Sequence, residues 1–343
     1  MNAHPEGAVP EAGGGEGAVP EAGGEAGGGA PAVSVVIVSH NTADLTCRAV
    51  RSVIGTAGEL PVQVIVVDNC STDGSAEAVR RLGMGVEVDE VGANLGFGAA
   101  NNRGVARATA PYVLFLNPDA ELVGDAMAHL VAEAGAHPGR GFYSGLTERS
   151  DGTINDATVR NLPTLTSLLA FGLLVSTIFR ARPWTDPEHV VVDPAGGPVD
   201  VEVVTASLLL VDRALFERLG GFDERIFLYS EEVDLFRRAA ALGGGPRLVP
   251  AARIRHDAGQ ATPDWARRQA LMMAGRTTYV RLAFDGWRRR VALAALSVGV
   301  AGRALAEWVQ RAPSRWRVVW TARGWWQPGY LADRAHPLDG LDL

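Results

Sequence analysis

The sequence contains no lysine, so all 32 of its basic residues are arginine. Cysteine occurs only twice, and Cys47 and Cys70 have neither the spacing of metal ligands nor a disulfide framework, which fits a reducing cytosol. The N-terminus has neither a basic patch nor an apolar run, so no secretory signal is predicted. The 343 residues are 47% hydrophobic, which is enough for one large domain or two modest domains.

The first 32 residues are mostly Gly, Ala, Glu and Pro, and the unit EGAVPEAGG occurs at 6–14 and again at 16–24. A segment of this composition has almost no apolar surface to bury, so residues 1–32 are predicted to form a solvated, disordered tail. A docking role is the alternative, because all of its charged side chains are acidic.

Strands and helices alternate after this tail. Four segments predict strands, at 33–39, 62–68, 85–91 and 112–116. Helices are expected over about 43–55, and between the second and third strands with an end near Gly83. This alternation predicts an α/β fold with a parallel sheet and right-handed crossovers.

The second half has a different pattern. A strand is predicted over 203–211, followed by a short helix that Gly220 and Gly221 end. A second helix is predicted from Glu231 to about Leu242, with Ser230 as its N-cap. A short strand and a loop then carry His256.

Polar side chains follow the predicted strands of the first half, namely Ser39, His40, Asp68, Asn69, Asn117 and Asp119. The carboxyl ends of the strands form the ligand-binding edge of such a sheet. Pro118 cannot donate to a sheet ladder, so its strand must end at this edge. Ordinary structural roles remain open, because Asp68 can form a turn and Asp119 can start a helix.

Other candidate residues have equally ordinary alternatives. Glu231, Glu232 and Asp234 occupy a predicted helix N-terminus, where acidic residues commonly complement the helix dipole. A single histidine such as His256 is more often structural than a metal ligand. Taken one at a time, these residues do not define a reaction.

Six segments in this order and spacing resemble the family-2 glycosyltransferases of the GT-A fold, and the rhamnosyltransferase-like branch that builds bacterial surface polysaccharides. They are VSVVIVSHNTADL, VIVVDNCSTDGS, ANLGFGAANNRGV, YVLFLNPDAEL, GGFDERIFLYSEEVDLFRR and RIRHDAG. The resemblance spans roughly residues 33 to 285. It implies a mostly parallel central sheet flanked by helices, with a C-terminal helical extension.

The resemblance also implies a division of the chain. Residues 33–263 would be the GT-A catalytic domain, with a nucleotide-sugar half at 33–120 and an acceptor half at 121–263. Residues 264–343 would form an Arg- and Trp-rich helical C-terminal region.

The resemblance assigns roles by position. The expected donor-binding residues are Ser39, Asn41, Asp68, Asn94, Gly96, Phe97 and Asn117. Asp119 corresponds to the second acid of the family's Asp-x-Asp metal signature, and His256 corresponds to a histidine that can complete the metal shell. Glu232 is in the place of the catalytic base, with Glu231 as the alternative that shares this role.

The implied reaction gives these residues a purpose. A Mg²⁺ or Mn²⁺ ion bridging the donor phosphates stabilises the leaving diphosphate as a Lewis acid. A carboxylate at a helix N-terminus stays ionised and can accept the proton of the acceptor hydroxyl, so Glu232 suits a base. Direct displacement on the opposite face of the sugar predicts inversion at the anomeric carbon.

Three positions depart from the family pattern. Asn117 replaces the first acid of the metal signature, and a neutral amide binds a hard cation more weakly than a carboxylate. Glu232 replaces the usual Asp and is longer by one C–C bond. The acceptor-side strand reads VVTAS at 203–207, where the family often has Trp-x-Ser-Gly.

The C-terminal region differs in composition from the rest of the chain. Between Trp265 and Trp326 there are seven Trp and twelve Arg, against only two acidic residues. Arg and Trp together suit an anionic membrane surface, although the apolar run 291–301 is too short to span a bilayer. The uncharged stretch 161–179 would line the acceptor entrance or dip into the interface. Packing against the catalytic domain is the alternative for both segments.

The sequence therefore predicts an inverting glycosyltransferase in cell-wall or surface-polysaccharide synthesis. It would be cytoplasmic, at the inner face of the plasma membrane, and would act on a glycan or polyprenyl-linked acceptor. Rhamnose from dTDP-rhamnose is the expected donor, on the resemblance alone. No nucleic-acid partner is expected, because no such motif is visible and the rest of the chain is acidic.

The sequence bears on two other functions. A catalytically weak paralogue that binds nucleotide sugar or glycan as a partner subunit is the alternative, favoured by Asn117 and Glu232. A nicotinamide-dependent oxidoreductase is disfavoured, because the first predicted strand–helix turn lacks G-x-G-x-x-G.

Overall fold

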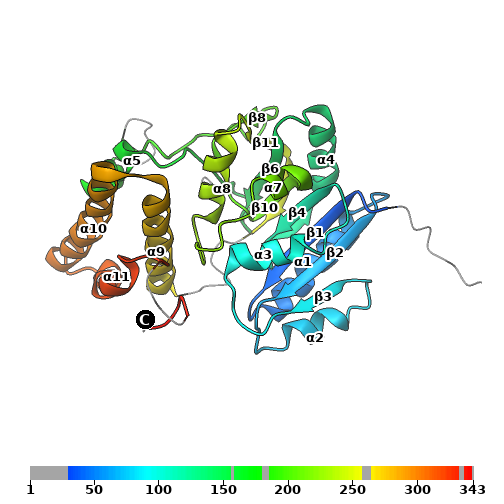
Figure 1. Cartoon of the computed structure of the whole chain (residues 1–343), viewed down its shortest axis with the longest axis horizontal. Coiled ribbons are helices and arrows are strands. Elements are labelled where there is room, and N and C mark those ends of the chain that lie inside the picture. Colours follow the sequence, from blue (N-terminus) through cyan, green and yellow to red (C-terminus); the bar gives the residue numbers. More distant parts are fainter. Residues whose placement is uncertain (1–29, 156–157, 180–184, 257–263, 332–335, 342–343) are drawn as a thin grey trace, which may run out of the picture.

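The computed structural model describes residues 30–155, 158–179, 185–256, 264–331 and 336–341. Within them, a nine-stranded mixed sheet with its helices lies at one end of the molecule, and a group of C-terminal helices lies at the other end (Figure 1). The predicted tail falls outside the described residues except for its last three positions.

The elements follow one another as the alternating pattern predicts. The strands of the main sheet are β1 (Val33–Ser39), β2 (Val62–Asp68), β3 (Glu87–Glu90), β4 (Tyr112–Leu116), β5 (Glu121–Val123), β6 (Gly141–Glu148), β8 (Val199–Asp200), β10 (Leu208–Asp212) and β11 (Gly245–Arg255). A second sheet pairs β7 (Val159–Arg160) with β9 (Val203–Val204). The helices are α1 (Ala43–Thr56), α2 (Ser75–Arg80), α3 (Phe97–Val105), α4 (Ala126–Ala136), α5 (Leu165–Gly172), α6 (Val175–Ile178), α7 (Arg213–Arg218), α8 (Glu231–Ala240), α9 (Trp265–Ala283), α10 (Gly286–Val309), α11 (Arg315–Thr321) and α12 (Arg323–Trp326).

The main sheet has the order β3-β2-β1-β4-β10-β6-β11-β5, with β8 paired to β11. Its first four strands are parallel, and β10 enters antiparallel between β4 and β6. β1 is buried along its whole length because helices cover both faces of the sheet. The parallel α/β core predicted for the first half is thus confirmed.

The predicted strand over 203–211 is wrong in its continuity. Its first two residues form β9 in the small sheet, and β10 begins only at Leu208. Between them, the Ser207 carbonyl accepts a hydrogen bond from the N–H of Asn117 at the end of β4. This interruption moves the chain from one sheet to the other and fixes the acceptor-side segment against the end of β4.

The segment after Pro118 also differs from the alternative in which Asp119 starts a helix. Glu121–Val123 pairs with β11 as β5, and α4 begins only at Ala126. Asp119 therefore lies in a short turn between two strands of the sheet. This turn keeps its carboxylate at the carboxyl end of β4.

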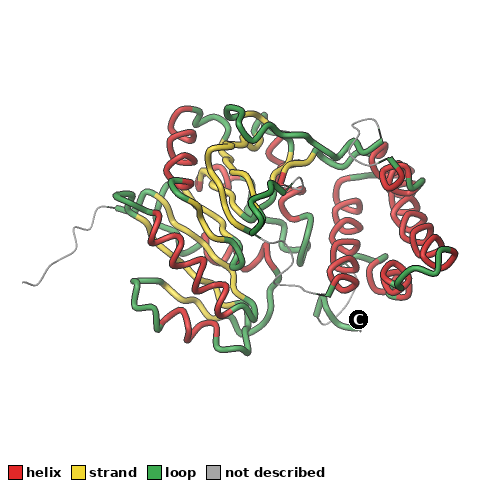
Figure 2. Tube along the Cα trace, turned by 180° about the vertical axis from the view of Figure 1, so that it is seen from behind, coloured by secondary structure: helices red, strands yellow, loops and turns green. Residues whose placement is uncertain are grey.

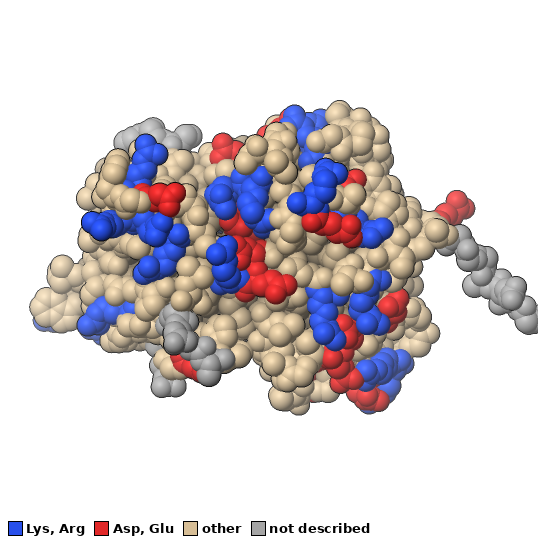
Figure 3. Space-filling model, in the orientation of Figure 1, with Lys and Arg blue, Asp and Glu red and all other residues tan. Residues whose placement is uncertain are grey.

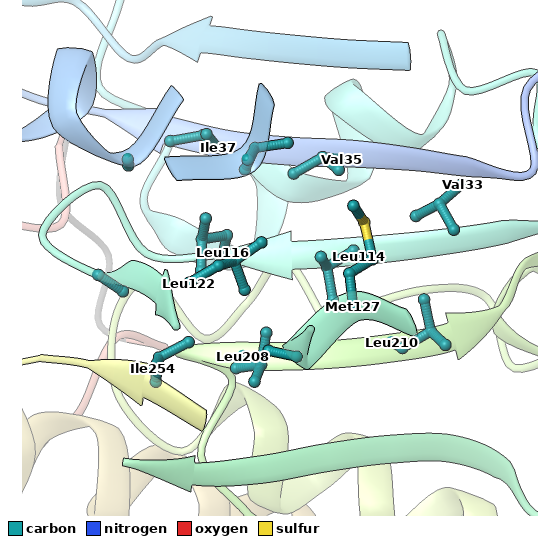
Figure 4. Close-up of a cluster of buried hydrophobic side chains, with 14 of the residues drawn as sticks. Val33, Val35, Ile37, Leu114, Leu116, Leu122, Met127, Leu208, Leu210 and Ile254 are labelled. Carbon is teal, nitrogen blue, oxygen red and sulfur yellow. The ribbon is translucent and has the colours of Figure 1, made fainter. Parts of the chain in front are cut away.

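Hydrophobic side chains fill both faces of the sheet. On one face, Val35, Leu114 and Leu210 from adjacent strands pack with Met127 of α4 (Figure 4). On the other face, Phe115, Phe216 and Phe222 form a buried aromatic group under α3 and α7. Successive residues of β4 therefore point to opposite layers, as the pleat requires.

The C-terminal helices have a core of their own, in which Trp326 is fully buried with Leu271 and Val300. α10 packs on α5 through Arg303, whose guanidinium lies 4.0 Å from the ring centroid of Phe171. Figure 2 shows this helical group beside the sheet end of the molecule. The helical content predicted for residues after 264 is confirmed within the described residues.

Candidate active site

The carboxyl ends of β1, β2 and β4 lie side by side, because the three strands pair in parallel register. Ser39 is paired with Asp68 across β1 and β2, and Asn117 follows the last residue of β4. The edge predicted to bind a ligand therefore exists as one surface. The direction of each side chain decides what that surface can bind.

Asp68 is 4% exposed, and its two carboxylate oxygens have different surroundings. Oδ1 accepts a hydrogen bond from the N–H of Ser71 at 2.8 Å, which closes the turn after β2. Oδ2 is buried and has no hydrogen-bond partner in the described structure. An orphaned buried carboxylate oxygen is costly, so Asp68 has one acceptor position left for a ligand hydroxyl or N–H group. The turn and ligand roles of Asp68 are compatible.

Ser39 and Asn41 both make hydrogen bonds within the protein, although Asn41 is exposed. The Ser39 side chain is fully buried and bonds to the hydroxyls of Thr42 and Thr46. Asn41 has a φ of +55°, and its Oδ1 accepts from the N–H of Thr72 at 2.7 Å. Both side chains therefore join the turn after β1 to its neighbours, and the donor contacts expected of them stay a prediction.

The loop before α3 is held by a compact network around Asn94. The Asn94 Oδ1 accepts from the Asn69 side-chain amide at 2.9 Å and from the Gly96 N–H at 3.0 Å. Gly96 has a φ of +83°, and a Cβ there would lie 2.2 Å from the carbonyl oxygen of Phe227. The same carbonyl accepts from the N–H of Phe97. Only glycine fits this position, because the segment before α8 lies directly against the loop.

Two histidines that the sequence did not assign to this loop hold Asn94 from opposite sides. His40 donates from Nδ1 to the Asn69 carbonyl, and its Nε2 lies 3.3 Å from the Asn94 side-chain amide. His336 donates from Nε2 to the Asn94 carbonyl at 3.0 Å. No local pattern reveals the second contact, because 242 positions separate the two residues.

Asp119 and His256 meet at the same edge. Their Oδ1 and Nε2 atoms are 3.0 Å apart, and both side chains are largely buried. His256 lies one residue after β11, and its N–H donates to the Glu148 carbonyl of β6. The long-range pairing of β11 with β5 and β6 therefore brings the two predicted ligands together.

Glu231 and Glu232 begin α8 and have different surroundings. Glu231 is 5% exposed, its Oε2 has no hydrogen-bond partner in the described structure, and its Cβ is close to Gly98 of α3. Burial, and then the charge of Glu232, hold the pKa of Glu231 well above its ordinary value. Glu232 is only half-buried, and Arg160 of β7 acts on it.

Burial also raises the pKa of Glu232, although its backbone N–H and Arg160 oppose that rise. The expectation that the helix dipole simply keeps this carboxylate ionised is therefore incomplete. A raised pKa brings a carboxylate closer to the range in which a general base works well. The α8 start also lacks its predicted cap, because Ser230 has a φ of +77° and its side chain makes no capping bond.

Asp234, in the next turn of α8, has a structural role. It is fully buried, and its two oxygens bind Arg237 at 2.6 Å and Arg238 at 2.7 Å. Arg238 also donates to the carbonyl oxygens of Leu219 and Gly221. These bonds fix α8 to the preceding loop and thereby position the two glutamates.

Comparison with known proteins decides the family. A model of glycosyl transferase family 2 matches residues 34–194. Over 273 residues the chain is 32% identical to N-acetylglucosaminyl-diphospho-decaprenol L-rhamnosyltransferase of Mycobacterium tuberculosis, with 74% of this chain and 86% of that protein covered. The chain belongs to the family-2 glycosyltransferases.

A second curated relative agrees with this family. The glycosyltransferase is 27% identical over 237 residues to rhamnosyltransferase WbbL of Escherichia coli, with 65% of this chain and 83% of that protein covered. The structure of S. aureus TarS in complex with UDP-GlcNAc has a TM-score of 0.49 and 14% identity, with coverage of 84% and 78%. That structural likeness is too low to carry an argument.

The glycosyltransferase has the GT-A fold expected of its family, and its similarities are rhamnosyltransferase-like. Among the described residues, no group of three or more His, Cys, Asp and Glu side chains could hold a metal ion. Asp119 and His256 supply only two ligand side chains. A divalent ion at this edge would need further oxygen atoms from a bound diphosphate, which is how Mg²⁺ is commonly held.

Proposed function

We propose that this family-2 glycosyltransferase transfers rhamnose from dTDP-rhamnose, with inversion, to a polyprenyl-diphosphate-linked GlcNAc or a related glycan acceptor. Cell-wall or surface-polysaccharide synthesis would use this product. The 32% identity to the decaprenol-linked rhamnosyltransferase of M. tuberculosis is the observation that carries the proposal. It extends over 74% of the chain, and thus beyond the segment that the family model matches.

The donor nucleotide would bind at the ends of β1, β2 and β4. The unpartnered Oδ2 of Asp68 suits a hydrogen bond from the base or ribose. Asn94, Gly96 and Phe97 would form the wall of this site, held in place by Asn69 and Phe227. Asn117 would contribute its side chain next to the phosphates, at the end of β4.

Asp119 and His256 would hold a divalent metal ion together with the donor diphosphate. Their side chains are largely buried and lie 3.0 Å apart, which is close enough for both to bind the same metal ion. Carboxylate and imidazole donors together suit Mn²⁺ better than Mg²⁺, which strongly prefers oxygen. When bound, the ion supplies Lewis-acid stabilisation of the leaving diphosphate.

Glu232 would accept the proton of the acceptor hydroxyl. Its partial exposure gives an acceptor access, whereas Glu231 is almost completely enclosed beside α3. Glu231 would act as a positioning residue beside the base. The acceptor side would include the Thr205 and Ser207 hydroxyls, which lie 2.8 Å apart.

A peripheral position on the membrane would bring the enzyme to a polyprenyl-linked acceptor. α10 is 24 residues long, about 36 Å, and is long and apolar enough to cross a bilayer by length and composition alone. The expectation from the run 291–301, that no span is long enough, therefore does not hold for the whole helix. Its inner face packs on α5 and α9, which favours a helix that lies on the membrane rather than across it.

The outer face of α10 is apolar and exposed. Trp287, Val298, Leu305 and Val309 fall within about 40° of one another at 100° per residue, and each is at least 56% exposed. Leu173 and Ile178 of the adjoining α5–α6 segment are exposed by 69% and 68%. In Figure 3 this end of the molecule shows several Arg patches on an otherwise mostly uncharged surface. An apolar stripe flanked by Arg suits an anionic membrane surface.

Flotation with anionic liposomes tests the membrane position. Replacement of Trp287 and Leu305 by Gln should reduce recovery with the liposomes several-fold. Leu242→Gln is the control, because Leu242 is also 66% exposed but lies after α8 in the sheet end of the molecule. Equal recovery of all three proteins would remove this part of the proposal.

Transfer assays with dTDP-, UDP- and GDP-sugars test the donor. The wild type is given Mn²⁺ and a polyprenyl-diphosphate-GlcNAc acceptor, and Asp119→Ala and Glu232→Gln are compared with it. Rhamnose transfer only from the dTDP donor, lost in both variants, is expected. Nucleotide binding without turnover on any donor would instead favour a catalytically weak paralogue that binds nucleotide sugar or glycan as a partner subunit.

A further inference from the structure

A cavity lies between α9, α10 and α12, in the C-terminal helical group. Its volume is about 250 Å³, and Thr277, Arg281, Leu293, Ala294, Ser297, Trp326 and Gln327 line it. None of these residues belongs to the proposed donor or acceptor site. At about 30 Å³ for each water of liquid volume, the cavity has room for a small polar group.

Arg281 is the unusual residue of this cavity. Within the described residues, no carboxylate forms an ion pair with its guanidinium, whereas Arg276 on the preceding turn of α9 pairs with Glu188. The only hydrogen bond found for Arg281 in the described structure runs from one terminal nitrogen to the Gln327 carbonyl at 3.2 Å. Its Nε is buried and has no hydrogen-bond partner there. A half-buried cation without a counter-charge is costly, and an anion would remove that cost.

Thr277 lies one turn before Arg281 on the same face of α9. It is 1% exposed, and its hydroxyl is also buried without a hydrogen-bond partner in the described structure. The other polar side chains of the cavity have partners for their donors, because Gln327 donates from Nε2 to the Ser297 hydroxyl at 3.0 Å and Ser297 donates to the Leu293 carbonyl at 3.1 Å. The unmet donors are therefore concentrated at Thr277 and Arg281.

We propose that this cavity binds a phosphate group. Arg281 would supply the charge and its Nε–H, and the Thr277 hydroxyl would donate a second hydrogen bond. Guanidinium and hydroxyl donors suit a tetrahedral oxyanion, and charge-assisted bonds of this kind are among the strongest in proteins. The apolar wall of Leu293, Ala294 and Trp326 leaves the rest of the ligand unspecified.

The phosphate can come from a free anion or from the headgroup of an anionic lipid. Ala294 is itself exposed and lies within about 20° of Trp287 on the α10 helical wheel. The cavity therefore adjoins the exposed apolar stripe of α10. A lipid headgroup could enter from that side, whereas inorganic phosphate needs no apolar surface. The site itself does not depend on the proposed sugar transfer.

The test uses the full chain and two ligand arms. In the first arm, inorganic phosphate is titrated while calorimetry and the melting temperature are followed. In the second arm, flotation compares phosphatidylglycerol vesicles with phosphatidylcholine vesicles. Arg281→Gln and Thr277→Val are compared with Arg288→Gln, a control that removes one exposed Arg from α10.

Arg281→Gln should weaken binding about tenfold or more in whichever arm the wild type is active, and Thr277→Val should weaken it less. Binding of inorganic phosphate marks a free-anion site, and loss confined to phosphatidylglycerol vesicles marks a headgroup site. Arg288→Gln should leave phosphate binding unchanged.

The stability of the ligand-free variants supplies an independent readout. Removing an unpaired, half-buried cation should leave the melting temperature of Arg281→Gln in phosphate-free buffer equal to that of the wild type or higher. A purely structural Arg281 would give a lower melting temperature and an unchanged response to phosphate. That result, or a wild type that binds in neither arm, would overturn the proposal.

Discussion

Glu231 and Glu232 are neighbours on α8, but they differ in burial and in the groups around them. Glu231 is buried next to α3, and one of its carboxylate oxygens has no hydrogen-bond partner in the described structure. Glu232 is partly exposed, and the charge of Arg160 lowers its pKa against the effect of burial. The sequence reveals two acids at a helix start and cannot rank them. The ranking depends on burial, which the loop before α8 and the packing of α3 determine.

Replacement of Glu232 by Gln should reduce the transfer rate by about 10²- to 10⁴-fold with little change in donor binding. A general base must be ionised, and burial raises the pKa of this carboxyl. The wild-type rate should therefore fall, as the pH is lowered, already above the usual titration range of a glutamate. A pH–rate profile and a nucleotide-binding titration check this prediction. A variant with wild-type turnover would transfer the base role to Glu231.

Glu231→Gln should change stability more than chemistry. A carboxyl whose pKa is higher in the folded state than in the unfolded state favours folding at low pH, and this stability is lost as the pH rises through the folded-state pKa. The pKa of Glu231 is raised in this way. The melting temperature of the variant should exceed that of the wild type by a margin that grows with pH. Glu59→Gln, at an exposed position, should show no such trend.

Asn117 and Asp119 allow a test of the metal site in both directions. Asp119→Asn should weaken Mn²⁺ binding in the presence of dTDP at least about tenfold, because it removes the only predicted carboxylate ligand. Asn117→Asp should strengthen that binding, because it restores a second negative charge at the end of β4. The Mn²⁺ dependence of the melting temperature with dTDP present reports both effects. A wild type that shows no such dependence would contradict the metal role.

At the scale of elements, local signals predicted the parallel half of the sheet with little error. The predicted strands at 33–39, 62–68 and 112–116 match β1, β2 and β4. Each is an apolar run between turn signals, and β1 and β4 also have an apolar strand on each side in the sheet. The local hydrophobic pattern and the burial in the fold agree for these strands, so the sequence alone is enough to predict them.

The second half could not be predicted as well, because its strands are defined by distant partners. β5 has only three residues and exists through β11, and β9 is separated from β10 by bonds to other segments. The meeting of Asp119 with His256 follows from the same long-range pairing. Only the resemblance to the family predicted that Asp119 and His256 act at one site, because the periodicity of the sequence carries no information about this pairing.

Gly96 is the point at which the donor loop and the segment before α8 meet. Gly96→Ala should destabilise the fold by at least about 1–3 kcal/mol and weaken nucleotide binding, because the added Cβ would collide with the Phe227 carbonyl at a positive φ. Gly92→Ala in the same loop is the control, because a Cβ there has no atom within 4 Å. Chemical denaturation and a dTDP titration measure the two effects. Equal stability of both variants would show that the contact does not constrain the loop.

At the scale of the whole molecule, the C-terminal segment reaches back to the donor loop. Phe227 and Tyr330 are in ring contact, with centroids 5.7 Å apart, and His336 lies 5.5 Å from the Phe227 ring. The Leu338 N–H donates to the His336 Nδ1, so its Nε2–H is directed at the Asn94 carbonyl. The C-terminal segment therefore contacts the donor loop through His336 and Asn94, and the segment before α8 through Phe227.

His336→Ala should accordingly weaken donor binding and leave the rate of the transfer step unchanged. The loss of one hydrogen bond to a backbone carbonyl costs about 0.5–1.5 kcal/mol, which corresponds to an increase of about two- to tenfold in the dissociation constant of the nucleotide. His336→Gln, which keeps a donor at this position, should recover part of the loss, and His129→Ala on the exposed face of α4 should have no effect. Because the Asn94 loop contacts the donor and not the acceptor in the proposed arrangement, the change should appear in KM for the donor rather than in kcat. A fall in kcat alone would mean that the C-terminal segment acts on α8 through Phe227, and not on the donor loop.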